Sequence, residues 1–210
     1  TPAAAAPTTA PAAETAAPAT EAPKAEAATK SSPTKVDFNT VKSAEEAGGM
    51  DALIAAAKAE GFDAGERMVI VDFKVHSSRP RLFVLTPKTG TVKAMHCAHG
   101  VGSDEAHTGY AKVFSNVPES GTSSLGAYRI LGQGYGAKHG PNLLIDGLES
   151  SNDKARERAI IIHSAWYADP AVIKQQGKMG RSNGCFVTSD SDRDTLFEML
   201  KPGMFLYAGV

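Results

Sequence analysis

The chain has 210 residues and a formal net charge of −1. This balance excludes the strong excess of basic residues with which proteins bind nucleic acids or anionic membranes, and no apolar run approaches the ~20 residues of a membrane span. The length suits a single folded core with additional segments.

The chain begins with a segment that is predicted to be disordered. Residues 1–34 contain only Ala, Pro, Thr, Ser, Glu and Lys, and such a segment cannot bury enough apolar surface to offset its ordering entropy. The start, Thr-Pro-Ala without Met, is typical of a secreted protein after signal-peptide removal. Residues 35–66 are predicted to form an N-terminal helical segment, because apolar residues recur at helical spacing over 50–60.

The remaining segment, 67–210, is predicted to be a mainly β domain of the α+β class. Short apolar runs alternate with turns, which favours antiparallel hairpins over βαβ units. Three helices are expected, at 152–158, 169–177 and 190–200. The predicted strands are 68–73, 81–85, 91–98, 127–131, 143–148, 159–163 and 204–208.

The residues Arg181-Ser182-Asn183-Gly184-Cys185 carry the clearest chemical signal. A thiol follows a glycine, which lets the backbone approach closely and direct N–H groups at an oxyanion. His163, at the end of an apolar strand, supplies a base that tertiary folding can bring near the thiol. Arg181 and Lys178 are expected to lower the pKa of the thiol, and either Ser164 or a backbone carbonyl is expected to orient the imidazole.

The polar residues also suggest three other interpretations. A Cys97–Cys185 disulfide is compatible with the sequence, although the place of Cys97 in a predicted strand favours a buried free thiol. His96, His99 and His107 form a cluster that suggests a metal, but their spacing lacks regular strand geometry and no metal site is predicted. Ser123 and Ser124 suggest a serine nucleophile, but no base lies at a recognisable spacing.

These residues resemble the catalytic domain of L,D-transpeptidases, the YkuD-type family of peptidoglycan cross-linking enzymes. The family pattern is a histidine, a spacer, and then Ser/Thr-His-Gly-Cys followed by Arg or Asn. Here Asn183 replaces the motif histidine and Phe186 replaces the polar residue after the cysteine. Both departures resemble a divergent proteobacterial branch of the family. The similarity extends over about residues 67–190 and includes Phe114-Ser115-Asn116 and Asp146-Gly147-Leu148-Glu149.

The resemblance implies an L,D-transpeptidase-type β-sandwich and a reaction without cofactor. Cys185 would attack the diaminopimelate carbonyl of a donor stem peptide, His163 would move the protons, and an amine of an acceptor stem would resolve the thioester. A 1-3 link is favoured over a 3-3 link. Gly184 and Cys185 would donate backbone N–H groups to the oxyanion, and Arg181 would bind a stem carboxylate. Further substrate-binding candidates are Ser182, Asn183, Ser124, Gly126, Tyr135 and His139.

The resemblance further implies the periplasm as the location and carbapenem-type inhibitors as candidate ligands. Two other functions use the same residues. A cysteine L,D-carboxypeptidase would pass the acyl group to water, and a peptidoglycan-binding protein could keep the fold without catalysis. A third alternative, a metal-dependent peptidase, would depend on the histidine cluster.

Overall fold

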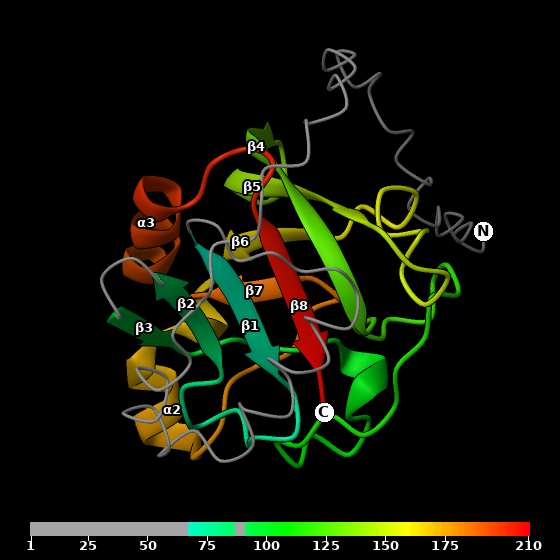
Figure 1. Cartoon of the computed structure of the whole chain (residues 1–210). Helices are drawn as coiled ribbons and strands as arrows, with labels where there is room; N and C mark the ends of the chain where they lie inside the picture. The colour runs from blue at the N-terminus through cyan, green and yellow to red at the C-terminus, as the bar shows by residue number, and fades with distance from the viewer. Residues whose placement is uncertain (1–66, 87–90) are drawn as a thin grey trace, which may run out of the picture. The chain divides into compact units, whose positions relative to one another are not determined.

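The strands of the protein form one mixed sheet, shown in Figure 1. The computed structural model describes residues 67–86 and 91–210, and within them the sheet has eight strands in the order β3-β2-β1-β8-β4-β5-β6-β7. The strands are β1 (Met68–Asp72), β2 (Leu82–Thr86), β3 (Thr91–Met95), β4 (Gly126–Gly136), β5 (Gly140–Gly147), β6 (Ile161–Ser164), β7 (Phe186–Thr188) and β8 (Phe205–Gly209).

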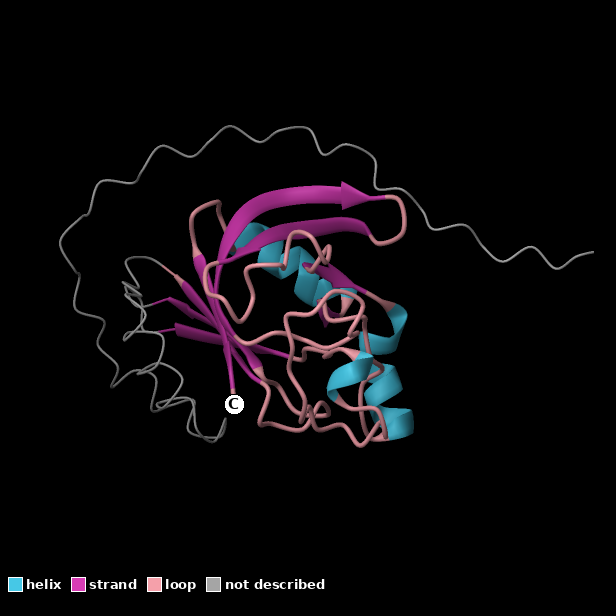
Figure 2. Ribbon diagram, turned by 90° about the vertical axis from the view of Figure 1, so that its right-hand side faces the viewer, coloured by secondary structure: helices cyan, strands magenta, loops and turns pink. Residues whose placement is uncertain are grey.

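The predicted mainly β class is confirmed. Antiparallel pairs join β1 to β2, β2 to β3 and β4 to β5, whereas β1–β8 and β6–β7 are parallel pairs. The sheet bends, and in Figure 2 the β4–β5 hairpin arches over a helix while β1, β2 and β3 lie to one side. One hydrophobic cluster includes Val69 and Val84 from one half of the sheet and Leu143 and Ile162 from the other. The sandwich-like core is therefore enclosed by a single hydrogen-bonded sheet.

Two predicted helices are confirmed, α2 (Pro170–Gln176) and α3 (Asp190–Met199). The Asp169 side chain accepts a hydrogen bond from the Ala171 N–H at the start of α2, and the Ser189 hydroxyl accepts one from the Asp192 N–H at the start of α3. Two short 3₁₀ helices are η2 (Val101–Ser103) and η3 (Trp166–Ala168). No helix in the described ranges is long and apolar enough to cross a membrane.

The predicted helix at 152–158 is wrong, because these residues form consecutive turns. The fully buried Asn152 side chain accepts a hydrogen bond from the Glu149 N–H and donates one to the Ala127 carbonyl. An Asn side chain bound to other parts of the chain does not cap a helix of its own. The predicted tail 1–34, the segment 35–66 with its helix, and the turn 87–90 lie outside the described residues.

A buried charged network fixes the loop that follows β3. The fully buried Arg81 donates from Nη2 to Nδ1 of His99 at 2.7 Å, and Nε2 of His99 donates to the Asp104 carboxylate at 3.3 Å. Burial and the charge of Arg81 lower the pKa of His99 to about 3. The imidazole is therefore neutral at neutral pH, and it connects a cation to an anion as both acceptor and donor.

We predict that His99→Leu destabilises the fold by about 3–5 kcal/mol, because it leaves Arg81 and Asp104 buried without their shared partner. Urea unfolding at pH 7 measures this change. The exposed Lys93→Gln is the control and should stay within about 0.5 kcal/mol of the parent. The unfolded imidazole binds a proton near pH 6.5, whereas the folded one does so near 3. The stabilisation should therefore be complete above pH 6.5 and decrease towards pH 3 in the parent. Equal stability of the parent and His99→Leu would contradict the prediction.

Candidate active site

The parallel pair of β6 and β7 brings the two predicted catalytic residues to the same part of the sheet. His163 on β6 lies opposite Val187 on β7, and Cys185 directly precedes β7. Alternate residues of a strand share a face, so we expect the thiol on the face that carries His163. Cys185 is 8% exposed and His163 is 1% exposed. The strand register therefore brings the backbones of the two predicted catalytic residues to neighbouring positions.

The backbone carbonyl of Ser164 orients the imidazole of His163. Nδ1 of His163 donates to this carbonyl at 2.9 Å, which leaves Nε2 as the unprotonated acceptor. Burial lowers the pKa of His163 to about 4, the hydrogen bond with the Ser164 carbonyl acts in the opposite direction, and His139 and Lys138 add smaller lowering effects. The ring is neutral at neutral pH and has the tautomer that a general base requires.

The thiol of Cys185 is held in its protonated form. Burial raises its pKa, while the Ile161 N–H, Arg158 and Lys138 act in the opposite direction. The S–H group points to the Ala159 carbonyl, 3.7 Å from the sulfur. The resting site is therefore a neutral thiol with a neutral imidazole, and the nucleophile must form by proton transfer during the reaction.

The expected source of positive charge beside the thiol requires a correction. Arg181 and Lys178 precede Cys185 in the sequence, but the cations that act on the thiol are Arg158 and Lys138. Arg181 turns away and donates from Nη1 to the carbonyl oxygens of Asp104 and Glu105. Proximity in sequence did not place this charge beside the thiol, because the Arg181 guanidinium binds the 104–105 backbone instead.

The loop before the nucleophile is fixed by its own hydrogen bonds. Ser182 Oγ donates to the Cys185 carbonyl at 2.8 Å and accepts from the Gly184 N–H at 3.1 Å. Gly184 has φ 117°, and a Cβ at this position would lie 2.5 Å from the Thr122 carbonyl oxygen. Only glycine fits this conformation and this approach.

The two predicted oxyanion donors are consequently in different states. The Gly184 N–H is engaged by the Ser182 hydroxyl, whereas the Cys185 N–H acts to lower the pKa of its own thiol.

Arg158 is a residue at the site that the sequence did not single out. Its guanidinium donates to four oxygens, those of the Ser115 and Thr122 carbonyls and the Ser124 and Ser120 hydroxyls, at 2.8, 2.5, 2.6 and 3.4 Å. A Cβ on Gly184 would lie 3.1 Å from Arg158 Nη2. The guanidinium therefore joins the 115–124 loop to the nucleophile turn. The next residue, Ala159, has φ 52°, a strained conformation of the kind that often accompanies function.

We predict that Arg158→Gln slows acylation of Cys185 by about 10–100-fold, because a cation and several hydrogen bonds beside the nascent thiolate are lost. Arg158→Lys should recover part of the rate, since it restores the charge without the planar set of donors. Intact-protein mass spectrometry over time measures the adduct, and the exposed Arg156→Gln is the matched control. Equal acylation rates for Arg158→Gln and the parent would contradict an electrostatic role.

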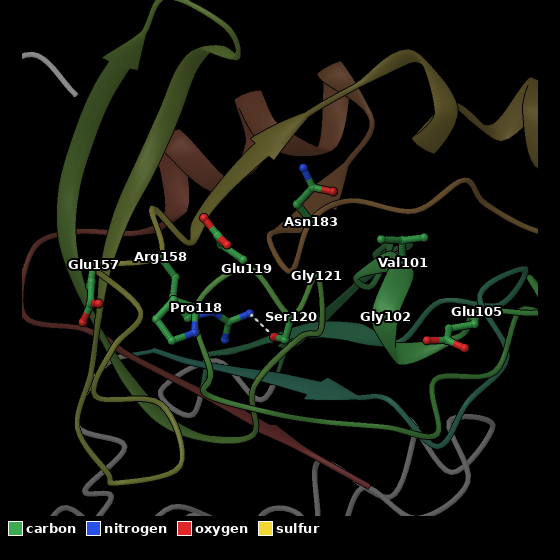
Figure 3. Close-up of a pocket in the computed structure, with 10 residues that line it drawn as sticks. All are labelled: Val101, Gly102, Glu105, Pro118, Glu119, Ser120, Gly121, Glu157, Arg158 and Asn183. Carbon is green, nitrogen blue, oxygen red and sulfur yellow. Dashed lines mark hydrogen bonds between the residues drawn. The ribbon is translucent and has the colours of Figure 1, made fainter. Parts of the chain in front are cut away.

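Two cavities flank the nucleophile loop, and Val101 and Asn183 line both. The larger, of about 690 Å³, contains Arg158 together with the acidic side chains of Glu105, Glu119 and Glu157. Figure 3 shows Arg158 and Asn183 among its lining residues, with the hydrogen bond from Arg158 to Ser120. The smaller, of about 390 Å³, is lined by aromatic and polar residues, namely His107, Trp166, Tyr167, Val172, Gln176, Gly180, Arg181 and Ser182 in addition to the shared pair.

The remaining predicted substrate-binding residues have different environments. Ser124 is buried and accepts the hydrogen bond from Arg158, and Gly126 is buried where a Cβ would meet the Glu149 carboxylate. Both residues are therefore buried parts of the protein beneath the site and not exposed groups on its surface. Tyr135 is 80% exposed on β4. The His139 ring lies against that of His163, with 4.1 Å between the ring centroids.

The residues behind the three alternative interpretations, the disulfide, the histidine cluster and the serine nucleophile, all have other roles in the structure. Both cysteines are free thiols, so the disulfide is not formed. His96, His99 and His107 donate from Nε2 to the Ser78 carbonyl, the Asp104 carboxylate and the Met179 carbonyl respectively, each to a different partner. Ser123 is fully buried and donates to the Gly184 carbonyl, which makes it a support of the nucleophile loop.

Comparison with known families identifies the family of this chain. A sequence model of the L,D-transpeptidase catalytic domain matches residues 35–208, and the chain belongs to this family. No curated protein sequence matches.

Solved structures of similar fold include L,D-transpeptidases from three actinobacteria. That from Mycobacterium smegmatis has 13% identity and a TM-score of 0.42, with 69% of this chain and 59% of that chain covered. One from Mycobacterium tuberculosis H37Rv has 15% identity and a TM-score of 0.42, with 69% and 58% covered. One from Stackebrandtia nassauensis has 17% identity and a TM-score of 0.40, with 78% and 67% covered. The chain thus spans about three fifths of the length of the two mycobacterial proteins.

Proposed function

We propose that this protein is a cysteine-dependent L,D-transpeptidase that cross-links peptidoglycan stem peptides through a thioester on Cys185. Membership of the family supports the reaction class. The observation that carries the assignment of residues is the neutral His163 ring, held through Nδ1 by the Ser164 carbonyl on a strand whose parallel neighbour, β7, begins directly after Cys185. This arrangement has the parts of a nucleophile and base pair with a fixed tautomer.

In the acylation step, Nε2 of His163 takes the thiol proton as the sulfur attacks the carbonyl carbon of diaminopimelate at position three of the donor stem. The new S–C bond gives a tetrahedral oxyanion, towards which the Cys185 N–H can point. The C–N bond to D-Ala then breaks, and the leaving nitrogen receives the proton from the imidazolium. The products of this step are free D-Ala and the thioester.

In the second step, an acceptor amine attacks the thioester carbonyl and loses a proton to Nε2 of His163. The sulfur leaves and recovers that proton, so the enzyme returns to its starting state. We propose that the amine is that of L-Ala at position one, which gives a 1-3 link. Arg181, which lines the smaller cavity, remains our candidate for binding a stem carboxylate, because a guanidinium matches its geometry.

The setting of this reaction is also part of the proposal. Peptidoglycan and its stem peptides lie outside the cytoplasmic membrane, so we place the protein in the periplasm after removal of a signal peptide. We also propose that carbapenems acylate Cys185, because the proposed reaction requires an activated thiol and the β-lactam carbonyl of a carbapenem is a group that such a thiol attacks. A solved L,D-transpeptidase in complex with imipenem is among the structures of similar fold.

The experiment that tests the function is incubation of the protein with two substrates, followed by liquid chromatography and tandem mass spectrometry. The donors are disaccharide tetrapeptides containing diaminopimelate, and the added acceptors are free tetrapeptides, whose L-Ala amine is not bound to muramic acid. Dimers that have lost one D-Ala, with the bond on the L-Ala amine, are the expected product. A bond on the diaminopimelate amine would replace the 1-3 assignment with 3-3. Tripeptide monomers alone would show a hydrolase, and unchanged substrate together with no imipenem adduct would reject catalysis.

A further inference from the structure

The turn of the β4–β5 hairpin places a second imidazole on the proposed general base. The ring centroids of His139 and His163 are 4.1 Å apart, and the ring planes are inclined by 35°. His139 lies at the end of the turn, next to Gly140, where β5 begins. One histidine comes from the hairpin turn and the other from β6, and they pack ring on ring.

The register of the hairpin places the side chain of Asn142 beside His163 as well. Asn142 on β5 is directly opposite His163 on β6, and Gly134 on β4 is directly opposite Asn142. Directly paired residues project to the same face, and Gly134 has no side chain there. A Cβ on Gly134 would lie 2.9 Å from the Asn142 Oδ1 atom. The missing side chain leaves room for Asn142 beside the His163 position.

Asn142 is itself unusual. It is 2% exposed, and its Nδ2 group donates to the Gly140 carbonyl at 2.9 Å, whereas its Oδ1 atom is buried without a hydrogen-bond partner. A buried acceptor without a partner is costly unless something else in the site uses it. The hairpin thus contributes two features next to His163, the packed His139 ring and a buried polar atom without a partner.

We propose that His139 is a positioning residue of this enzyme. Its ring packs on His163 and, by excluding water from it, holds that imidazole neutral and oriented so that Nε2 can take the thiol proton. The inference rests on the proposed function, because it assigns His163 the role of base. His139 itself exchanges no proton with substrate and acts through the contact between the rings.

The other groups around His163 are consistent with this role. Lys138, also from the hairpin turn, is the other cation that disfavours a charged His163. From α3, Asp190 and Arg193 bind the Ser164 hydroxyl, while the Ser164 carbonyl holds Nδ1. Cys185 approaches from the start of β7. Burial is the largest cause that lowers the pKa of His163, and the His139 ring packs against the His163 ring.

The test compares His139→Ala with His139→Phe. Alanine removes the ring and admits water, so the pKa of His163 should rise from about 4 by about one unit or more. The rate of Cys185 acylation by imipenem should fall at a correspondingly higher pH than in the parent. At pH 7 this rate should be about tenfold lower than that of the parent. Phenylalanine keeps the packing without a titrating group, so its acid limb and rate should stay close to those of the parent.

Two readouts separate this inference from the function on which it rests. NMR titration of histidine-labelled protein follows the His163 ring directly, and imipenem adduct formation follows Cys185. Circular dichroism at each pH confirms that the variants are folded, and Gln133→Ala, an exposed change on the same hairpin, should match the parent. If imipenem forms no adduct with the parent, the proposed function is rejected. The inference about His139 is still tested in that case, because the NMR titration reports its effect on His163.

The inference is overturned if His139→Ala titrates and acylates like the parent. It is also overturned if His139→Phe is as impaired as His139→Ala, since the imidazole itself, and not its packing, would then be required.

Discussion

Replacing Cys185 with alanine should abolish D-Ala release, cross-linking and imipenem adduct formation. The thiol is the group that forms the covalent intermediate, and removal of a nucleophile in acyl transfer lowers kcat by about 10⁴-fold or more. Cys97 cannot replace it, because it is fully buried and burial raises its pKa to about 12. The measurements are a coupled D-Ala assay, muropeptide analysis and the mass of the intact protein after treatment with imipenem.

Stability serves as the control for this variant. Cys185→Ala removes one sulfur from a turn held by the Ser182 hydroxyl, which binds the Cys185 carbonyl and the Gly184 N–H. The free energy of unfolding in urea should therefore change by no more than about 1–2 kcal/mol. Cys97→Ala is the matched variant, with the other free cysteine removed, and it should keep its activity and its adduct. Cross-linking by folded Cys185→Ala would exclude the thioester route. Loss of the adduct in folded Cys97→Ala would show that the wrong cysteine has been assigned.

The strands of the core could be predicted from sequence because each is a short apolar run between turn residues. β1, β2 and β8 follow this pattern closely. The β4–β5 hairpin extends well beyond the predicted 127–131, because residues 132–136 are Gly-Gln-Gly-Tyr-Gly, which carries no apolar periodicity. Pairing with β5 and not local preference makes this segment a strand. This same extension carries His139 to His163.

The nucleophile and the base could be proposed from sequence because each has a local signature, a thiol after glycine and a histidine at the end of an apolar strand. Arg158 could not, since its role depends on the 115–124 loop, whose carbonyl and hydroxyl oxygens gather around the guanidinium only after folding. Within the sequence it belongs to a polar run that resembled an exposed helix. The sequence also suggested Arg181 as the activating charge, whereas the folded chain uses this side chain to bind the Asp104 and Glu105 carbonyls.

The orienting group for the base is another feature that only the structure distinguishes. Sequence left open whether the Ser164 hydroxyl or a backbone carbonyl holds the ring. The carbonyl of Ser164 binds Nδ1 of His163, and the hydroxyl instead binds Asp190 and Arg193 at the start of α3. A backbone group cannot be removed by mutation, so this part of the site is insensitive to the identity of residue 164.

His163→Ala should lower the rate of Cys185 acylation by about 10²–10⁴-fold, the usual contribution of a positioned base. Ser164→Ala is its matched control, because it keeps the orienting carbonyl and removes only the hydroxyl, and it should retain most of the activity. The initial rate of imipenem adduct formation at pH 7 measures both variants. A fully active His163→Ala would place the base elsewhere, and a strongly impaired Ser164→Ala would transfer the orienting role to the hydroxyl.

The pH dependence of the same rate gives a sharper test of the neutral pair. In the parent, activity requires unprotonated His163, so the rate should fall only as the pH approaches about 4 and should be level through neutral pH. In His163→Ala no group takes the thiol proton, and the reaction depends on thiolate formed in solution. Because burial raises the pKa of Cys185, that rate should rise about tenfold per pH unit through the neutral and mildly alkaline range. An acid limb near pH 6.5 in the parent would contradict the lowered pKa of His163, and a level profile in His163→Ala would contradict a thiol that rests in its protonated form.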